Sequence, residues 1–234
     1  MNVKLSVIIP VYNEFRTIEK IILKVRSLNL DLQILVVDDC SNDGTKEILT
    51  EKCSDYIDDL IFHERNLGKG AAIKSAKNKV KGDFVIIQDA DLEYDPNDYI
   101  KMIKIMTEQN LKVLYGSRVL NKSIFQNLQN FSHAIRIIGN VFLTKFSNFL
   151  NNQNLTDAHT CYKMFESDLF KKIDLNENGF NFCPEITTKI SKINVEIQET
   201  EINYQGRSYK EGKKIKSIDG FYAILTILKY KFSK

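Results

Sequence analysis

Short apolar segments alternate with helical patterns through the first half of the chain, and this alternation restricts the fold more than any other feature. The segments predict strands at Leu5–Ile9, Leu32–Val37, Leu60–Phe62 and Phe84–Ile87. The last segment contains no polar residue, which is typical of a strand buried on both faces. Because helical patterns and short polar connections separate the strands, we expect an α/β fold with a mostly parallel sheet and helices on both faces.

Acidic residues follow three of these strands, where each strand ends. They are Glu14, Asp39 and the pair Asp89 and Asp91. The carboxyl ends of parallel strands lie at one edge of the sheet, where open α/β sheets bind ligands, so we expect these loops to converge on one crevice. Carboxylate oxygens suit Mg²⁺ or Mn²⁺, particularly when the metal also bridges a diphosphate. A single Asp-x-Asp is more typical of a solvated turn, and the convergence is what favours a site.

The second half of the chain differs in character from the first. Its apolar patterns predict helices at 133–150 and 186–193, an alternating strand at 195–204 and a last helix at 218–232. No internal repeat or low-complexity linker divides the sequence. We therefore expect a single domain over residues 1–234.

Basic charge is concentrated in two parts of the second half. Residues 119–156 contain no Asp or Glu but include Arg136 and two lysines, and residues 207–234 carry eight basic side chains against two acidic ones. Both parts favour an anionic partner. We expect residues 118–156 to face an acceptor or a membrane surface, and residues 204–234 to form a basic loop and a C-terminal helix.

The cysteines and apolar runs indicate the compartment. The four cysteines form no C-x-x-C pair and are typical of reduced thiols in a cytosolic protein. No signal-peptide pattern opens the sequence. The apolar run Phe221–Leu228 is much shorter than the roughly 20 residues of a membrane span. We expect a cytoplasmic protein that is soluble or peripheral on the cytosolic face of a membrane.

Six segments resemble, in order, those of a known family. Four lie in the first half, at Ser6–Glu14, Val36–Thr45, Asn66–Ala72 and Asp89–Asp91. Two lie in the second half, at Leu155–Phe165 and Tyr204–Ile215. Over roughly residues 4–230 the chain is similar to family 2 glycosyltransferases, and the last two segments resemble the dolichol-phosphate mannosyltransferase branch. The resemblance implies the Rossmann-like GT-A fold of nucleotide-diphospho-sugar transferases.

The resemblance assigns the acidic residues after the fourth strand to a metal and sugar site. Asp91 is the expected metal ligand, with Glu93 as a second and Asp89 in contact with the metal or the sugar. A divalent cation stabilises the negative charge that develops on a leaving nucleoside diphosphate. Two residues depart from the branch. Glu93 adds a carboxylate where Gln is common, and Cys40 takes the place of a turn glycine.

The resemblance also implies residues for donor and acceptor. The implied nucleotide-sugar residues are Pro10, Tyr12, Glu14, Val37, Asp39, Lys69, Ala90, Arg207 and Lys213, and the implied catalytic residues are Asp89, Asp91, Asp157 and Arg118. Asp39 suits hydrogen bonding to the base or ribose. Arg118 and Arg136 are expected to bind an acceptor phosphate, since guanidinium groups bind phosphates through paired donors. For Lys69 and Arg136 an ordinary surface role is an equal alternative.

The need for a base separates two kinds of acceptor. A sugar hydroxyl requires a carboxylate to remove its proton, and Asp157 is the candidate. A polyprenyl phosphate has a second pKa of about 6, like other phosphomonoesters, and is already an anionic nucleophile. The acid-free, apolar segment 119–156 favours a lipid phosphate, which leaves Asp157 to orient its neighbours.

These features predict an inverting, metal-dependent hexosyltransferase that takes mannose from GDP-mannose to a polyprenyl or dolichyl phosphate. A UDP-sugar donor, such as UDP-glucose or UDP-GlcNAc, or a hydroxyl acceptor is the alternative within this fold. A non-catalytic nucleotide-sugar-binding subunit is the alternative from another class. A nucleic-acid partner is not expected, because the basic segments lack interleaved aromatic residues.

Overall fold

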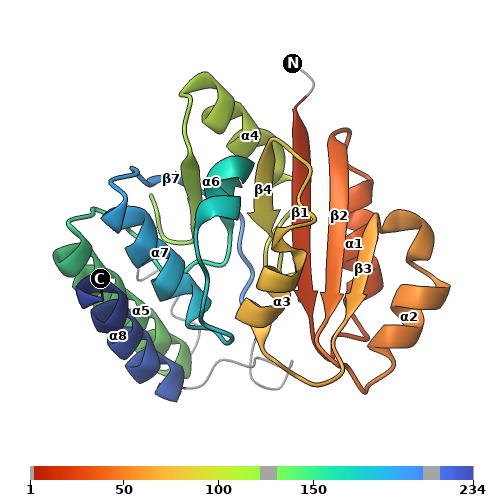
Figure 1. Cartoon of the computed structure of the whole chain (residues 1–234). Coiled ribbons are helices and arrows are strands. Elements are labelled where there is room, and N and C mark those ends of the chain that lie inside the picture. Colours follow the sequence, from red (N-terminus) through yellow and green to blue (C-terminus); the bar gives the residue numbers. More distant parts are fainter. Residues whose placement is uncertain (1–2, 122–130, 208–216, 234) are drawn as a thin grey trace.

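One seven-stranded sheet runs through the molecule in the order β3-β2-β1-β4-β6-β5-β7 (Figure 1). In this computed structural model the described residues are 3–121, 131–207 and 217–233. The strands are β1 (Lys4–Val11), β2 (Asp31–Asp38), β3 (Asp59–Phe62), β4 (Phe84–Ile87), β5 (Val113–Ser117), β6 (Lys163–Glu166) and β7 (Gln198–Glu201). All neighbouring pairs are parallel except those of β6, which is antiparallel to β4 and β5. The predicted mostly parallel sheet is confirmed.

Helices cover both faces of the sheet. They are α1 (Ile18–Arg26), α2 (Thr45–Glu51), α3 (Lys69–Lys77), α4 (Asp98–Glu108), α5 (Phe131–Asn151), α6 (Ser167–Lys172), α7 (Phe182–Lys192) and α8 (Ser217–Phe232), with a short 3₁₀ turn at Ser54–Tyr56. Side chains from α1, α2 and α4 form the core on one face, and those from α3, α6 and α7 form the core on the other. Helices α5 and α8 form an outer layer, in contact with each other and with α7.

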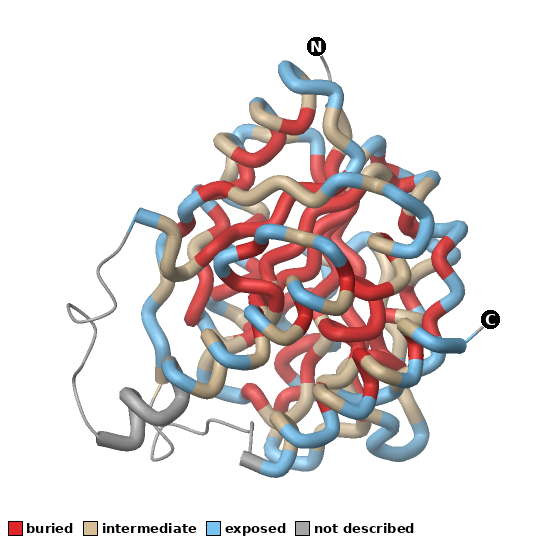
Figure 2. Tube along the Cα trace, turned by 90° about the vertical axis from the view of Figure 1, so that its left-hand side faces the viewer, coloured by how far each residue is buried: buried red, intermediate tan, exposed pale blue. Residues whose placement is uncertain are grey.

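Strand β1 shows why two cores form. Leu5, Val7 and Ile9 belong to one core, whereas Ile8 belongs to the other, because successive side chains of a strand point to opposite faces. All four are fully buried, and each such side chain contributes roughly 1.5–3 kcal/mol relative to exposure. The buried segments gather in the middle of the molecule (Figure 2).

Several elements differ from those predicted. The predicted strand at 195–204 shortens to β7, and Tyr204 instead forms an isolated bridge with Tyr94. Helix α7 begins at Phe182, four residues earlier than predicted, with Pro184 in its first turn, where a missing N–H is tolerated. Strand β6 was not predicted, because four residues that begin with lysine and end with glutamate lack the usual apolar pattern.

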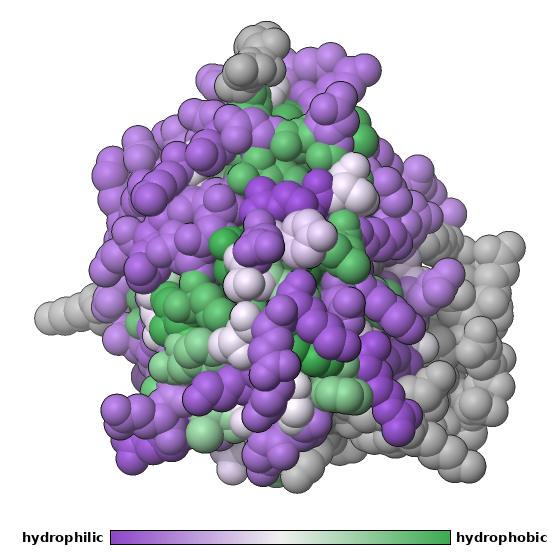
Figure 3. Space-filling view, turned by 90° about the vertical axis from the view of Figure 1, so that its right-hand side faces the viewer, coloured by the Kyte–Doolittle hydropathy of each residue, from purple (hydrophilic) through white to green (hydrophobic). Residues whose placement is uncertain are grey.

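Exposed apolar side chains are concentrated on helices α5 and α8. The face that carries α2 is mostly hydrophilic (Figure 3). By contrast, α5 exposes Ile138, Phe142 and Phe149, and α8 exposes Ile218, Phe221, Tyr222, Leu225 and Phe232. We call these eight residues the apolar face. Within the described ranges, no helix is both long and apolar enough to cross a membrane.

Candidate functional site

The predicted site residues lie on loops that share one edge of the sheet. Strands β1, β2, β4 and β5 all end at this edge, which is the lower one in Figure 1. The antiparallel strand β6 begins there, so the turn before it, which carries Asp157, reaches the same edge. The convergence expected from the sequence is therefore present.

Arg207 holds three acidic side chains of the site together. Its Nη1 and Nη2 donate to the two carboxylate oxygens of Glu14, both at 3.0 Å, and Nη2 also donates to Oδ2 of Asp91 at 2.9 Å. Its Nε lies 3.8 Å from Oε1 of Glu93. The four side chains are 9–17% exposed. Loops after β1, β4 and β7 thus meet around one guanidinium group.

Glu93 binds the segment that carries Arg207. Its Oε2 accepts a hydrogen bond from the Tyr204 hydroxyl, and its Oε1 accepts one from the backbone N–H of Arg207, both at 2.6 Å. The backbone N–H of Gln205 donates to the Glu93 carbonyl at 2.8 Å. The carboxylate that departs from the branch pattern therefore ties the loop after β4 to residues 204–207.

Asp91 is a carboxyl group of this cluster with a raised pKa. Burial, together with the nearby carboxylates of Asp89 and Glu93, raises the pKa of Asp91 to about 6, although Arg207 acts in the opposite direction. The backbone N–H of Glu93 donates to Oδ1 of Asp91 at 3.1 Å. Carboxylates crowded in this way favour a bound cation.

Asp89 has a different partner from Asp91. The Lys69 ammonium group donates to Oδ1 of Asp89, and both side chains are largely buried. Burial alone would lower the pKa of Lys69, but Asp89 raises it well above its usual value. Gly68, with φ +97°, places Lys69 at the start of α3, and a Cβ at Gly68 would lie 2.5 Å from the Asn178 carbonyl oxygen. Lys69 is therefore a largely buried ion-pair partner of Asp89 rather than a solvated lysine, and its role in donor binding stays a prediction.

Asp39 is bonded within the protein on both carboxylate oxygens. Oδ1 accepts from Leu67 N–H at 2.8 Å and lies 2.7 Å from Nδ1 of His63, while Oδ2 accepts from Gly68 N–H at 2.7 Å. Nε2 of His63 lies 2.9 Å from the Ser75 hydroxyl. Asp39 thus shapes the turn before Lys69, and its contact with a base or ribose stays a prediction. No sequence pattern pointed to His63, because the histidines lack the spacing of metal ligands.

The remaining donor residues surround the same strand ends. Pro10 of β1 pairs with Val37 of β2, and Tyr12 follows β1 directly. Ala90 is buried between Asp89 and Asp91. The neighbouring Cys40 has φ +64°, so a non-glycine residue does occupy the left-handed turn position predicted from the sequence.

Arg118 and Asp157 form a buried pair on the other side of the edge. Nε and Nη2 of Arg118 donate to the two oxygens of Asp157 at 2.7 and 2.8 Å, and the Arg118 backbone N–H donates at 3.1 Å. The guanidinium carbon lies 5.2 Å from the centre of the Tyr204 ring. Burial raises the pKa of Asp157, but the bonds from Arg118 outweigh it, so the pKa is below its usual value. A carboxylate with a lowered pKa is a weak proton acceptor.

Glu199 holds the backbone of the turn that carries Asp157. Its carboxylate oxygens accept hydrogen bonds from the backbone N–H groups of Thr156, at 2.6 Å, and Asp157, at 2.9 Å. Burial raises the pKa of Glu199, against these hydrogen bonds. Strand β7 therefore fixes the turn that presents Asp157 to Arg118.

Lys163 is a functional candidate that the sequence did not reveal. It is fully buried, its ammonium group donates to the Ala158 carbonyl at 2.9 Å, and it lies 3.6 Å from the centre of the Tyr115 ring. Burial lowers its pKa to about 8. This ammonium group holds the turn between Asp157 and β6, and nothing in a four-residue strand signals a buried lysine.

Two predicted residues cannot be placed in this geometry. Lys213 lies outside the described residues, and Arg136 lies in α5 at a position whose side chain is not described. Their roles stay predictions.

The carboxylates suit a divalent cation in kind but are held by basic side chains. Across residues 3–121, 131–207 and 217–233, no group of three or more His, Cys, Asp or Glu side chains is arranged to hold a metal. Lys69 forms an ion pair with Asp89, and Arg207 lies among Glu14, Asp91 and Glu93. A cation thus already lies within an all-oxygen set of the kind that Mg²⁺ or Mn²⁺ prefers. The donor set fits such an ion in its chemistry, and Arg207 occupies it in this structure.

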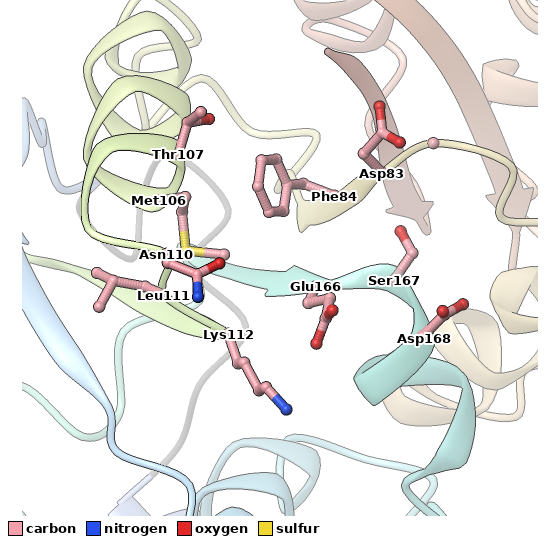
Figure 4. A pocket seen from close by; sticks show the side chains of 11 residues that line it. Asp83, Phe84, Met106, Thr107, Asn110, Leu111, Lys112, Glu166, Ser167 and Asp168 are labelled. Atoms are coloured by element: carbon pink, nitrogen blue, oxygen red, sulfur yellow. The ribbon is translucent and has the colours of Figure 1, made fainter.

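A separate hollow lies at the opposite edge of the sheet. Its volume is about 390 Å³, and Figure 4 shows its lining side chains, which come from the start of β4, the end of α4, the end of β6 and the start of α6. Phe84, which lines the hollow, is the first residue of β4, whereas the acidic loop follows the last residue of this strand. None of the predicted site residues lines it.

Comparison with known proteins identifies the family. Residues 6–174 match the family model of Glycosyl transferase family 2. The chain belongs to this family. It is 29% identical over 206 residues to the low-salt glycan biosynthesis hexosyltransferase Agl6 of Haloferax volcanii, covering 87% of this chain and 48% of that protein. It is also 28% identical over 221 residues to a dolichol-phosphate mannosyltransferase of Pyrococcus furiosus, covering 91% and 60%.

A third relative of this glycosyltransferase chain has a similar length. It is a UDP-N-acetylglucosamine–dolichyl-phosphate N-acetylglucosaminyltransferase of Methanococcus voltae, 25% identical over 245 residues, with 97% of this chain and 96% of that protein covered. The chain spans only about half the length of the first two relatives.

Solved structures confirm the GT-A fold. Mannosyl-3-phosphoglycerate synthase from Rubrobacter xylanophilus superposes with a TM-score of 0.73 at 18% identity, covering 97% of this chain and 72% of the other. Glucosyl-3-phosphoglycerate synthase from Mycobacterium tuberculosis, in complex with Mn²⁺, UDP and phosphoglyceric acid, gives 0.71 at 15% identity, covering 99% and 80%.

Proposed function

We propose that this chain is an inverting, metal-dependent glycosyltransferase that moves a hexose from a nucleoside diphosphate sugar to a polyprenyl or dolichyl phosphate. We propose GDP-mannose as the donor. The observation that carries the proposal is the buried Arg118–Asp157 pair, which offers a cation to an acceptor phosphate but no effective base to a hydroxyl. The single sheet is consistent with one catalytic domain over residues 1–234.

The donor would bind across the loops after β1, β2 and β4. Asp91 and Glu93 are the proposed metal ligands, with Asp89 beside them, and a bound divalent cation would stabilise the charge on the leaving diphosphate. Lys69 neutralises Asp89 and keeps it in place. Arg207 and Lys213 are the proposed cations for the diphosphate, because a guanidinium group can bind phosphate oxygens in pairs.

The acceptor phosphate would meet Arg118. Asp157 fixes the guanidinium plane through two hydrogen bonds, and the Tyr204 ring packs against its face. A phosphate oxygen placed there is already anionic and attacks the anomeric carbon as the bond to the diphosphate breaks, which inverts the configuration. Arg118 then stabilises the incoming charge by position, which is a contribution that requires no proton transfer.

The apolar face supports a membrane-bound acceptor. Ile138, Phe142 and Phe149 recur on one side of α5, with the exposed Lys145 among them, and α8 lies alongside. Exposed apolar side chains with interspersed basic residues favour the surface of an anionic bilayer. We propose that this face rests on the cytosolic side of a membrane, where a polyprenyl chain would remain in the lipid.

Two alternatives remain distinct from this proposal. A UDP-sugar donor is favoured by the name of the Methanococcus voltae relative, which acts with UDP-N-acetylglucosamine. A non-catalytic nucleotide-sugar-binding subunit would keep the donor loops and show no turnover.

A donor panel tests the proposal. GDP-mannose, UDP-glucose and UDP-GlcNAc would each be offered with Mn²⁺ and a short polyprenyl phosphate, using wild type, Asp91→Ala and the control Asp168→Ala at the opposite edge. We expect transfer from one donor, strongest with GDP-mannose, that Asp91→Ala abolishes and Asp168→Ala preserves. Transfer by Asp91→Ala at the wild-type rate would contradict the metal role. Binding of a donor without turnover would favour the non-catalytic subunit.

A further inference from the structure

Arg207 occupies the place of a cation in the acidic cluster. Its guanidinium group lies within 3.0 Å of oxygens from both Glu14 and Asp91, and its Nε lies 3.8 Å from Glu93. The three carboxylates come from two different loops, so no short-range sequence effect brings them to Arg207. The arrangement is built by the fold.

Among the described residues, the acids of this cluster share Arg207 and not Lys69. Three carboxylates surround one guanidinium group, and the Lys69 ammonium group is engaged by Asp89 rather than by these acids. A further cation bound by these acids would lie close to Arg207, whose charge opposes it.

A divalent ion on Asp91 and Glu93 would lie beside the guanidinium group. Like charges repel, and the repulsion is stronger in a partly buried site than in water. Both Nη groups of Arg207 already donate to carboxylates. These contacts hold Arg207 in the cluster until another anion replaces the carboxylates as the acceptor. A diphosphate is such an anion, because it accepts paired hydrogen bonds from guanidinium.

We propose that Arg207 is an internal counter-cation that excludes the metal from the donor-free site and gives way to it only when a nucleoside diphosphate binds. This inference rests on the proposed metal and diphosphate site. Its consequence is that metal and nucleotide bind with positive coupling. The nucleotide draws Arg207 away from the carboxylates, and the metal then takes the place of Arg207 on them. By linkage, the nucleotide must strengthen metal binding by the same factor as the metal strengthens nucleotide binding.

The test measures Mn²⁺ affinity by titration calorimetry and by the paramagnetic resonance signal of free Mn²⁺, with no sugar transfer involved. The proteins are wild type, Arg207→Met, Arg207→Lys and the control Lys101→Met. Lys101 lies on α4, bonded to Glu201 at the surface, so its loss removes the same charge outside the cluster. Each protein is measured alone, with GDP and with UDP.

We expect Arg207→Met to bind Mn²⁺ alone about tenfold more tightly than wild type, which lies within the usual range of coupling between sites. Arg207→Lys should fall between them, and Lys101→Met should match wild type. In wild type, one of the two nucleotides should raise Mn²⁺ affinity, and this gain should shrink in Arg207→Met.

Two results separate failure of this inference from failure of the proposed function. If Arg207→Met binds Mn²⁺ alone no more tightly than wild type, while a nucleotide still raises the affinity of both, Arg207 is not a competing cation and the metal site stands. If no protein binds Mn²⁺ with or without either nucleotide, the metal site itself is wrong. Thermal unfolding confirms that each variant is folded.

Discussion

At the scale of single residues, pairing decides which acids can do chemistry. Asp157 is bonded to Arg118 through both oxygens, Asp89 is bonded to Lys69, and Asp91 shares Arg207 with its neighbours. The family resemblance assigns all of these residues to one site, but it cannot show which basic side chain meets which acid, because the partners are separated by 20 to 116 positions. The pairing, rather than the presence of carboxylates, separates an orienting role from a basic one.

Replacement of Asp157 by Asn tests the orienting role. The change removes a charge-assisted hydrogen bond worth roughly 1.5–3 kcal/mol, so we expect kcat/KM for a phosphate acceptor to fall about 10- to 100-fold without reaching zero. The measurement is steady-state transfer, with donor affinity measured in parallel. Complete loss of transfer with unchanged donor affinity would instead identify Asp157 as a base.

The raised pKa of Asp91 predicts how metal binding depends on pH. Below about pH 6 the folded protein holds a proton on Asp91, and this proton must leave before a cation binds. Apparent Mn²⁺ affinity without nucleotide should therefore fall about tenfold per pH unit below pH 6 and level off above about pH 7. Calorimetry between pH 5 and 8 measures it. A flat profile in wild type, or the same slope in Asp91→Asn, would contradict the assignment.

Lys163 predicts a pH dependence of stability with a definite sign. Its pKa in the folded protein, about 8, is lower than the usual 10.5, so between these values the unfolded chain binds more protons and folding becomes more favourable as pH rises. Relative to Lys163→Met, wild type should gain about 2 kcal/mol between pH 7 and pH 10. Urea unfolding at both pH values measures the difference. A difference that does not change with pH would show that Lys163 is not a buried cation.

At the scale of elements, helices α5 and α8 differ from the other helices because they expose several large apolar side chains. Most helices bury their apolar residues against the sheet, but these two form an outer layer and expose Phe149 to 84% and Phe232 to 73%. Their apolar patterns were visible in the sequence. Which residues would be exposed was not, because that depends on the packing of α5 and α8 against α7.

The apolar face should bind anionic vesicles. Phe149→Ser combined with Phe221→Ser should reduce binding to vesicles of phosphatidylglycerol and phosphatidylcholine several-fold, because each aromatic side chain contributes buried apolar area. Leu23→Ser, at an exposed position on α1, is the matched control. Co-sedimentation at low and high salt measures the effect, and binding should weaken with salt. Equal binding by the double variant and the control would contradict a membrane-facing role.

At the scale of the whole molecule, the sheet was predictable to the extent that its strands are apolar. Strands β1, β2 and β4 each contain a run of buried residues and were predicted within two residues of their ends. Strand β6 escaped prediction because its order and direction follow from tertiary packing, with Lys163 buried beside Tyr115. The edge of the site followed from topology. The contacts of Asp39 with His63 and of Glu93 with Tyr204 join distant loops and required the structure.

A competition between two acceptors most directly tests whether transfer proceeds without a protein base. The full chain, with Mn²⁺ and the donor that supports turnover, would be offered a short polyprenyl phosphate and the matching polyprenol in equal amounts, and the products identified by mass spectrometry. We expect the hexose on the phosphate alone, since Arg118 offers a cation to an anionic acceptor and Asp157, with its lowered pKa, is a weak base for an alcohol. A glycosylated polyprenol, or no glycosylated phosphate, would contradict it.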